Sequence, residues 1–127
     1  MSASEDSHAT RALIGLGSNQ GDPERQVRRA LEALAKVPQT RVRRHSRLFR
    51  TAPWGFREQP AFVNAVAELA TTLDADDLFA ALLSIEREQG RRRDGHRWGP
   101  RTLDLDLLTF GDLRSSATEL VIPHPRI

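Results

Sequence analysis

An alternation of leucine and aspartate near the end of the chain constrains the fold most. Residues 103–108 read Leu-Asp-Leu-Asp-Leu-Leu. Side chains alternate between the two faces of a β-strand, so a strand here places three leucines on one face and Asp104 and Asp106 on the other. We therefore expect a strand whose leucine face lies against a core and whose aspartate face does not.

The two aspartates indicate a cation site. Carboxylates on one strand face, about 7 Å apart along the chain, repel each other unless a cation lies between them. Mg²⁺ usually takes one or two carboxylates together with waters and substrate phosphates. Arg97, Trp98 and Arg101 lie just upstream and suit phosphates and a ring. The alternative is a solvated strand face, which the low β-propensity of aspartate disfavours.

Length and composition indicate one domain with a sizeable core. Hydrophobic residues make up 39% of the 127 residues. The first ten residues are polar and predict a disordered leader, which leaves 11–127 as a single domain. No run of 18 apolar residues and no secretory h-region is present. The sequence has no cysteine, which fits a cytoplasmic protein.

Hydrophobic periodicity predicts the order β-α-β-β-α-β. This is the split βαβ, ferredoxin-like α+β arrangement, an antiparallel sheet with two main helices on one face. Asp22 and Pro23 suit the start of the first helix as N-cap and first helical residue, and Pro38 limits its end. Gly90 is the expected C-terminal cap of the second helix. The predicted strands cover 11–17, 40–50, 62–71 and 101–110, the second helix covers 76–89, a basic loop covers 91–100, and a short extended piece covers 120–122.

Arginines dominate the basic residues and point to a polyanionic ligand. All but one of the 19 lysines and arginines are arginine, which suits bidentate phosphate contacts. For the arginines between Arg25 and Arg47, ordinary surface positions are the alternative. Gly15-Leu16-Gly17 lacks the spacing and lysine of a phosphate-binding P-loop. The four histidines lack zinc-ligand spacing, so a zinc site is not expected.

Two further features have alternative interpretations. Trp54 and Phe56 lie on a Pro- and Gly-containing loop at 51–60, which either serves a ligand or folds onto its own core. Glu86 near the end of the second helix either binds a ribose or adenine or pairs with a neighbouring arginine.

Several motifs, in order along the chain, resemble the 6-hydroxymethyl-7,8-dihydropterin pyrophosphokinase family. The resemblance covers roughly residues 12–127. The matching motifs are Gly15-Leu16-Gly17-Ser18-Asn19, Arg50-Thr51-x-Pro53-x-Gly55, Gln59-Pro60-x-Phe62-x-Asn64, Ile85-Glu86, Gly90-Arg91-x-Arg93, Arg97-Trp98-Gly99-Pro100-Arg101-x-x-Asp104-Leu105-Asp106 and Val121-x-Pro123-His124-Pro125.

The resemblance implies transfer of pyrophosphate from ATP to 6-hydroxymethyl-7,8-dihydropterin in folate biosynthesis, with release of AMP. It implies loops at 18–22, 51–60 and 91–100 that close over the substrates. We expect a cytoplasmic monomer that acts on these small molecules and binds neither nucleic acid nor membrane. The implied residues are Arg91 and Arg101 for catalysis; Asp104 and Asp106 for two Mg²⁺ ions; Glu86, Arg91, Arg93, Trp98, Arg101 and His124 for ATP; and Gly17, Thr51, Trp54, Phe62, Asn64 and Trp98 for the pterin.

The chain departs from the family pattern at its end. The family usually continues about 25–35 residues past His124, with an arginine that faces ATP and a phenylalanine that completes the pterin sandwich opposite Phe62. A C-terminally truncated domain is therefore expected. A truncated form that binds ATP or pterin but turns over poorly is one alternative, and a ferredoxin-like RNA-binding module is another.

Overall fold

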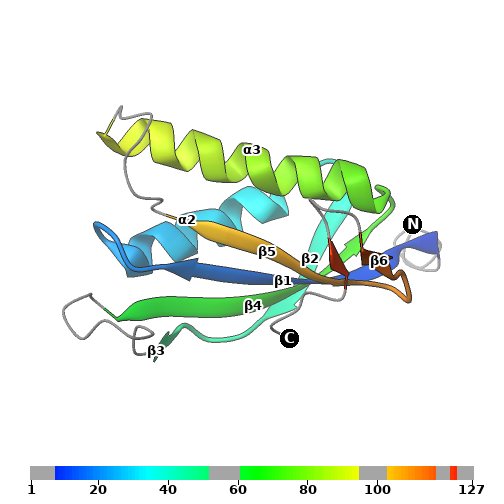
Figure 1. The fold of residues 1–127 in the computed structure, drawn as a ribbon, viewed down its shortest axis with the longest axis horizontal. Coiled ribbons are helices and arrows are strands. Elements are labelled where there is room, and N and C mark those ends of the chain that lie inside the picture. Colours follow the sequence, from blue (N-terminus) through cyan, green and yellow to red (C-terminus); the bar gives the residue numbers. More distant parts are fainter. Residues whose placement is uncertain (1–7, 52–60, 95–102, 117–120, 123–127) are drawn as a thin grey trace.

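The computed structural model describes residues 8–51, 61–94, 103–116 and 121–122, which form a five-stranded antiparallel sheet with two helices on one face (Figure 1). The strand order is β2-β4-β1-β5, and β3 also pairs with β4. This is the predicted α+β, ferredoxin-like arrangement. The elements are β1 (Thr10–Ser18), α2 (Pro23–Ala35), β2 (Thr40–His45), β3 (Phe49–Thr51), β4 (Phe62–Thr71), α3 (Ala75–Asp94), β5 (Asp104–Phe110), β6 (Ser115–Ser116) and β7 (Val121–Ile122).

Strand β1 lies at the centre of the sheet, between β4 and β5. Ala12, Ile14 and Leu16 are buried on its helix-covered face. Gly15 and Gly17 lie on the opposite, open face. The strand begins at Thr10, which pairs with Thr71, so the described sheet starts one residue before the predicted domain.

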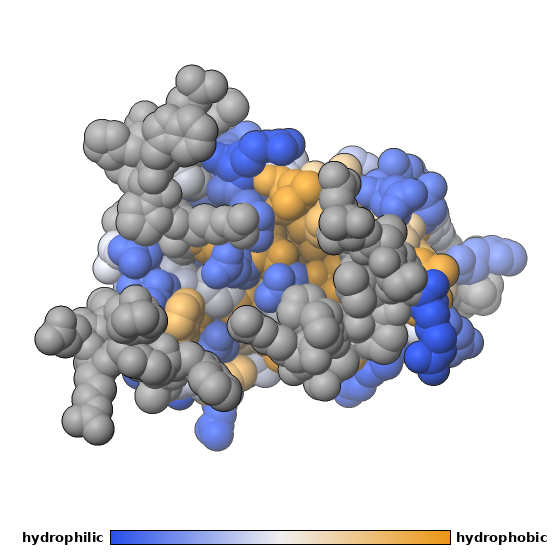
Figure 2. Space-filling view, viewed as in Figure 1, coloured by the Kyte–Doolittle hydropathy of each residue, from blue (hydrophilic) through white to orange (hydrophobic). Residues whose placement is uncertain are grey.

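The core lies between the sheet and the two helices. Leucines and small aliphatic residues from β1, β4, β5, α2 and α3 fill it, and each buried leucine contributes about 1.5–3 kcal/mol relative to an exposed one. Figure 2 shows hydrophobic surface in the middle of one face, with hydrophilic side chains around it. Partly buried side chains such as Phe79, Ile85 and Phe110 pack against this core. Among the described residues, neither helix is long and apolar enough to cross a membrane.

Helix α2 has the predicted start and end. The Asp22 carboxylate accepts a hydrogen bond from the Arg25 backbone N–H at 3.3 Å, and Pro23 occupies the first helical position. The helix ends at Ala35, before Pro38. Val27, Ala30 and Leu34, which have helical spacing, are fully buried.

Helix α3 is longer than the sequence predicted. It begins after Asp74, whose carboxylate accepts from the Asp77 N–H at 2.8 Å, and runs to Asp94. The prediction that Gly90 caps the helix is wrong, because Gly90 lies inside it, and the expected loop at 91–100 is helical as far as Asp94. One internal glycine costs about 1 kcal/mol, and the following arginines are good helix formers.

The predicted strand at 40–50 is interrupted. Ser46 separates β2 from β3: its N–H donates to the Val66 carbonyl at 2.8 Å, and its hydroxyl accepts from the Val66 N–H at 2.9 Å. The predicted strand at 101–110 begins at Asp104, and residues 101–102 lie outside the described part of the chain. The extended piece at 120–122 is β7 at Val121–Ile122, which pairs with β6, a strand that the sequence did not predict.

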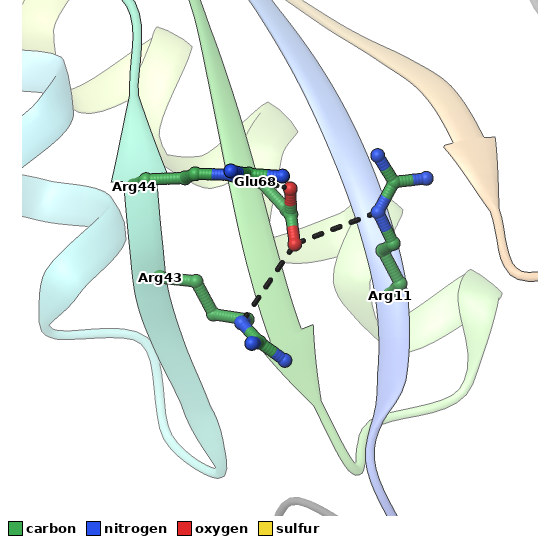
Figure 3. Close-up of polar contacts among 4 residues, drawn as sticks. All are labelled: Arg11, Arg43, Arg44 and Glu68. Atoms are coloured by element: carbon green, nitrogen blue, oxygen red, sulfur yellow. Dashed lines mark hydrogen bonds and ion pairs between the residues drawn. The ribbon is translucent and has the colours of Figure 1, made fainter.

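Glu68 of β4 joins three strands on the open face of the sheet (Figure 3). Its carboxylate lies 2.9 Å from Arg44 Nε, 3.5 Å from Arg11 Nε and 3.7 Å from Arg43 Nε. A β-bulge between Val42 and Arg44 lets the adjacent Arg43 and Arg44 both reach it. The hydrogen bond from Arg44, with further attraction from Arg11, lowers the pKa of Glu68 from its usual 4.5, although burial opposes this shift.

The Glu68 cluster predicts a specific loss of stability in acid. Because the pKa of Glu68 is lower in the folded than in the unfolded chain, its stabilisation is present above pH 4.5 and is lost as the pH falls through the folded-state pKa. We expect Glu68→Gln to flatten the fall in unfolding free energy between about pH 5 and pH 3. Urea unfolding at several pH values measures this fall. Glu88→Gln, at an exposed position of α3, is the control, and equal pH slopes for wild type and Glu68→Gln would contradict the prediction.

Candidate active site

One row of residues crosses four strands at the end of the open face. Asn64 of β4 pairs with Phe49 of β3 on one side and with Gly17 of β1 on the other. Gly17 pairs in turn with Asp104 of β5. Because neighbouring strands lie about 4.8 Å apart, the backbones of Asn64 and Asp104 are about 10 Å apart. The register therefore brings residues predicted for the pterin and for the metal into one line.

The two aspartates share a face as predicted. Leu103, Leu105 and Leu107 are 2%, 4% and 2% exposed, whereas Asp104 is half-buried and Asp106 is exposed. The strand thus buries its leucines and presents both carboxylates on the open face.

Each aspartate pairs with a glycine of β1. Asp104 lies opposite Gly17, and Asp106 lies opposite Gly15. No β1 side chain therefore stands beside either carboxylate.

This arrangement fits a divalent cation that binds together with a ligand. Two carboxylates on one open face supply the hard oxygen donors that Mg²⁺ prefers, and leave its other positions to water and phosphate. Within the described residues no group of three or more acidic, histidine or cysteine side chains is close enough to enclose a metal. Asp104 and Asp106 are thus a pair of carboxylates on one strand face, and their role as metal ligands stays a prediction.

Thr51, Phe62 and Asn64 lie together on the open face at the ends of β3 and β4. The Asn64 amide Nδ2 donates to the Thr51 hydroxyl at 2.8 Å. Thr51 pairs with Phe62, so the three side chains lie on adjacent strand positions. The structure thus places these three predicted ligand residues side by side.

Phe49 is a neighbour of this group that the sequence did not single out. Its side chain is 42% exposed, although it is a large hydrophobic residue, and it pairs with Asn64. The sequence could have pointed to Phe49, because strand alternation in Phe49-Arg50-Thr51 puts Phe49 and Thr51 on the same face. An exposed aromatic ring next to polar groups suits contact with a flat ligand.

Gly17 makes room for Asn64. A Cβ atom built on Gly17 would lie 3.2 Å from Asn64 Oδ1, which is closer than nine in ten real contacts of a Cβ atom. The glycine therefore lets the Asn64 carbonyl lie against the sheet and keeps the gap between Asn64 and Asp104 free of a side chain.

Glu86 of α3 contacts the strand that carries the aspartates. Its Oε2 accepts a hydrogen bond from the Leu105 backbone N–H at 2.6 Å. Arg91 and Arg93 occupy the last turns of α3. The remaining predicted site residues lie outside the described part of the chain: Trp54, Trp98, Arg101 and His124.

Comparison with known proteins identifies the family. Residues 13–127 match the model of the 7,8-dihydro-6-hydroxymethylpterin-pyrophosphokinase family. The chain belongs to this family. The predicted resemblance, which rested on seven short motifs, is confirmed over nearly the whole chain.

Bacterial members of the pyrophosphokinase family are similar over most of this chain. The 2-amino-4-hydroxy-6-hydroxymethyldihydropteridine pyrophosphokinase of Pseudomonas aeruginosa is 48% identical over 90% of this chain and 70% of the relative. The Bacillus subtilis enzyme of the same name is 40% identical over 91% of this chain and 69% of the relative. The chain thus spans about 70% of the length of these relatives.

A plant bifunctional protein and a solved structure of low similarity also align with this chain. A folate synthesis bifunctional protein of Arabidopsis thaliana is 45% identical over 91% of this chain, which spans 20% of that protein. Among solved structures, a dinuclear metal-binding M20-family peptidase from Bacillus subtilis aligns with 77% of this chain and 25% of its own, at a TM-score of 0.45 and 11% identity. That similarity is too low to support an argument.

A methyl group at position 17 should displace the Asn64 side chain. We expect Gly17→Ala to weaken the Asn64–Thr51 hydrogen bond, because the new Cβ would press on Asn64 Oδ1. The side-chain amide resonances of Asn64 in an NMR spectrum report this change. Gly90→Ala is the matched control, since a Cβ there meets nothing within 4 Å. Unchanged Asn64 resonances in Gly17→Ala would contradict the prediction, because they would show that a Cβ at position 17 does not displace the Asn64 side chain.

Proposed function

We propose that this chain transfers the β,γ-pyrophosphoryl group of ATP to the hydroxymethyl oxygen of 6-hydroxymethyl-7,8-dihydropterin, in folate biosynthesis. The observation that carries the proposal is the Asn64–Gly17–Asp104 row in a chain of the pyrophosphokinase family. A polar and aromatic group stands at one end of the row and a carboxylate pair at the other. The two ends suit the two substrates of the family.

The pterin is expected to bind over Thr51, Phe62 and Asn64. Because the Asn64 amide N–H already donates to Thr51, the Thr51 hydroxyl can donate to a ligand and Asn64 Oδ1 can accept from one. The pterin ring edge carries both kinds of partner. Phe62 would stack on the ring, and Phe49, which pairs with Asn64, adds a second aromatic face. Gly17 keeps the space beside the ring open.

Asp104 and Asp106 are the residues that would hold two Mg²⁺ ions with ATP. Bound Mg²⁺ supplies charge neutralisation for the phosphates and polarises the phosphorus that is attacked. The adjacent glycines add no β1 side chain beside the carboxylates, and the Leu108 side chain of β5 lies next to Gly15. Asp104 lies about 10 Å from the pterin end of the row, a spacing that supports binding of ATP beside the pterin.

The remaining assignments rest on the family resemblance. Arg91 and Arg101 are proposed to stabilise the charge that shifts from the β-phosphorus to the departing AMP oxygen. The pterin hydroxyl attacks the β-phosphorus, the bond from the α,β-bridging oxygen breaks, and the hydroxyl proton leaves to solvent. Glu86, Arg93, Trp98 and His124 are proposed to bind ATP, with Trp98 also facing the pterin beside Trp54. We also propose that the chain is a cytoplasmic monomer.

The open face does not suit base stacking on single-stranded RNA. Ferredoxin-like RNA-binding sheets stack bases on aromatic residues of their central strands. The central strand β1 has Gly15 and Gly17 on this face, and Asp104 and Asp106 stand beside them. The carboxylates would also repel a phosphate backbone. These features of β1 and β5 favour a small-molecule ligand over RNA, although Phe62 of β4 lies on the same face.

Removing the carboxylates tests the proposed function. We expect Asp104→Asn and Asp106→Asn each to reduce AMP release from ATP and the pterin by roughly 100-fold or more, because charge stabilisation of this kind is typically worth that much. A coupled AMP assay measures the rate at several Mg²⁺ concentrations. Asp112→Asn, at an exposed turn position, is the control.

Two outcomes of this assay would count against the proposal. Release of ADP instead of AMP would show a different transfer reaction. Binding of ATP and pterin by the wild-type chain without AMP release would favour the impaired, substrate-binding form.

A further inference from the structure

The backbone of the aspartate pair is held from two sides. Among the described strands, β5 is at the edge of the five-stranded sheet and pairs with β1 alone. The Leu105 N–H, between the two aspartates, donates to Glu86 Oε2 at 2.6 Å and therefore points away from β1. In an antiparallel ladder, neighbouring residues direct their backbone groups to opposite sides. Asp104 and Asp106 thus direct theirs toward β1, where they pair with Gly17 and Gly15.

Glu86 occupies the place that a further strand would take. The edge of β5 presents backbone groups that need partners, and the α3 carboxylate satisfies the one between the aspartates. Leu105 is 4% exposed, so little water is available to replace that partner.

The part of α3 that carries Glu86 is itself fixed. Gln89, one turn further along, donates through Nε2 to the Gln26 backbone carbonyl and to Gln26 Oε1, both at 3.3 Å. Gln26 belongs to α2 and is only 1% exposed. Ile85 packs against the core on the same stretch of helix. Glu86 therefore reaches β5 from a helix segment held by both polar and apolar contacts.

Glu86 is not a third ligand beside the Asp104–Asp106 pair. Among the described residues no three acidic groups lie close enough to share a metal ion, although Glu86 contacts the residue between Asp104 and Asp106. The aspartate side chains leave the strand on the open face, whereas Glu86 meets its edge from the helix side. The contact that Glu86 makes with β5 is to the backbone, which suits control of where the aspartates lie.

We propose that Glu86 is a positioning residue that holds the Asp104–Asp106 segment in the geometry needed to bind the metal ions, an inference that rests on the proposed function. It acts through the Leu105 N–H and requires a hydrogen-bond acceptor at position 86. Glutamine also supplies such an acceptor at this position. This role is distinct from a direct contact with ATP, which the family resemblance implies for the same residue.

Alanine and glutamine at position 86 separate the two roles. Glu86→Ala removes the acceptor, whereas Glu86→Gln keeps an oxygen at the same place and removes the charge. Glu88→Ala, at an exposed position of the same helix, is the control. The first measurement is hydrogen exchange of the Leu105 amide by NMR without substrates. The second is Mn²⁺ affinity by electron paramagnetic resonance in the presence of α,β-methylene-ATP.

We expect Glu86→Ala to speed exchange of the Leu105 amide and to weaken Mn²⁺ binding by roughly tenfold, as is typical when the support of a metal ligand is lost. Glu86→Gln and Glu88→Ala should stay close to wild type in both measurements. Unchanged Mn²⁺ affinity in Glu86→Ala would overturn the proposal. So would a glutamine variant as impaired as the alanine variant, or a rise in the KM for ATP in both variants with no change in Mn²⁺ affinity.

The proposed function can fail independently of this inference. A wild-type chain that binds Mn²⁺ with the ATP analogue but releases no AMP would contradict the proposed reaction. The amide exchange and Mn²⁺ affinities of the variants would still decide whether Glu86 positions the aspartates.

Discussion

The antiparallel pairing of β1 with β4 and β5 is the constraint on which the rest of this domain depends. The register sets Asn64, Gly17 and Asp104 in one row, although they come from three distant parts of the sequence. One face of β1 carries Ala12, Ile14 and Leu16 and makes the core. A shift of one residue in this pairing would exchange the two faces, so the burial of the core also determines the site.

Glycine has a particular part in this arrangement. Strands usually favour branched and aromatic residues, and glycine weakens them. Here Gly15 and Gly17 face the open side, between two strands that carry polar groups. The cost in strand stability is offset by the buried residues on the other face of β1. The result is a stretch of β1 that adds no side chain of its own between Asn64 and the two aspartates.

Two glutamates connect elements of the fold on either side of β1. Glu68 of β4 forms ion pairs with arginines of β1 and β2. Glu86 joins α3 to the edge of β5 through a hydrogen bond. Both carboxylates accept hydrogen bonds from groups on other elements of the fold. Their effects differ, since Glu68 binds exposed guanidinium groups, whereas Glu86 binds a backbone N–H beside a buried leucine. We expect the second contact to be the more sensitive to substitution, because water replaces it less easily.

Local signals in the sequence predicted the elements well where one interaction dominates. The Asp22 cap and Pro23 marked the start of α2, and the leucine–aspartate alternation gave the faces of β5 correctly. The prediction failed where competing effects are close in energy. Gly90 suggests a helix cap by its residue type, but three arginines continue α3 beyond it. The break at Ser46 and the β6–β7 pair depend on distant backbone partners that no local pattern shows.

The sequence by itself determined the family, the order of the elements and the kinds of chemical groups at the site, because each of these rests on residue type and spacing along the chain. Only the tertiary structure decided which groups are neighbours. It paired Phe49 with Asn64, placed Gly17 between Asn64 and Asp104, and brought Glu86 to the Leu105 N–H. The physical reason is that strand register and helix packing are set by burial of the whole core, which couples residues far apart in sequence.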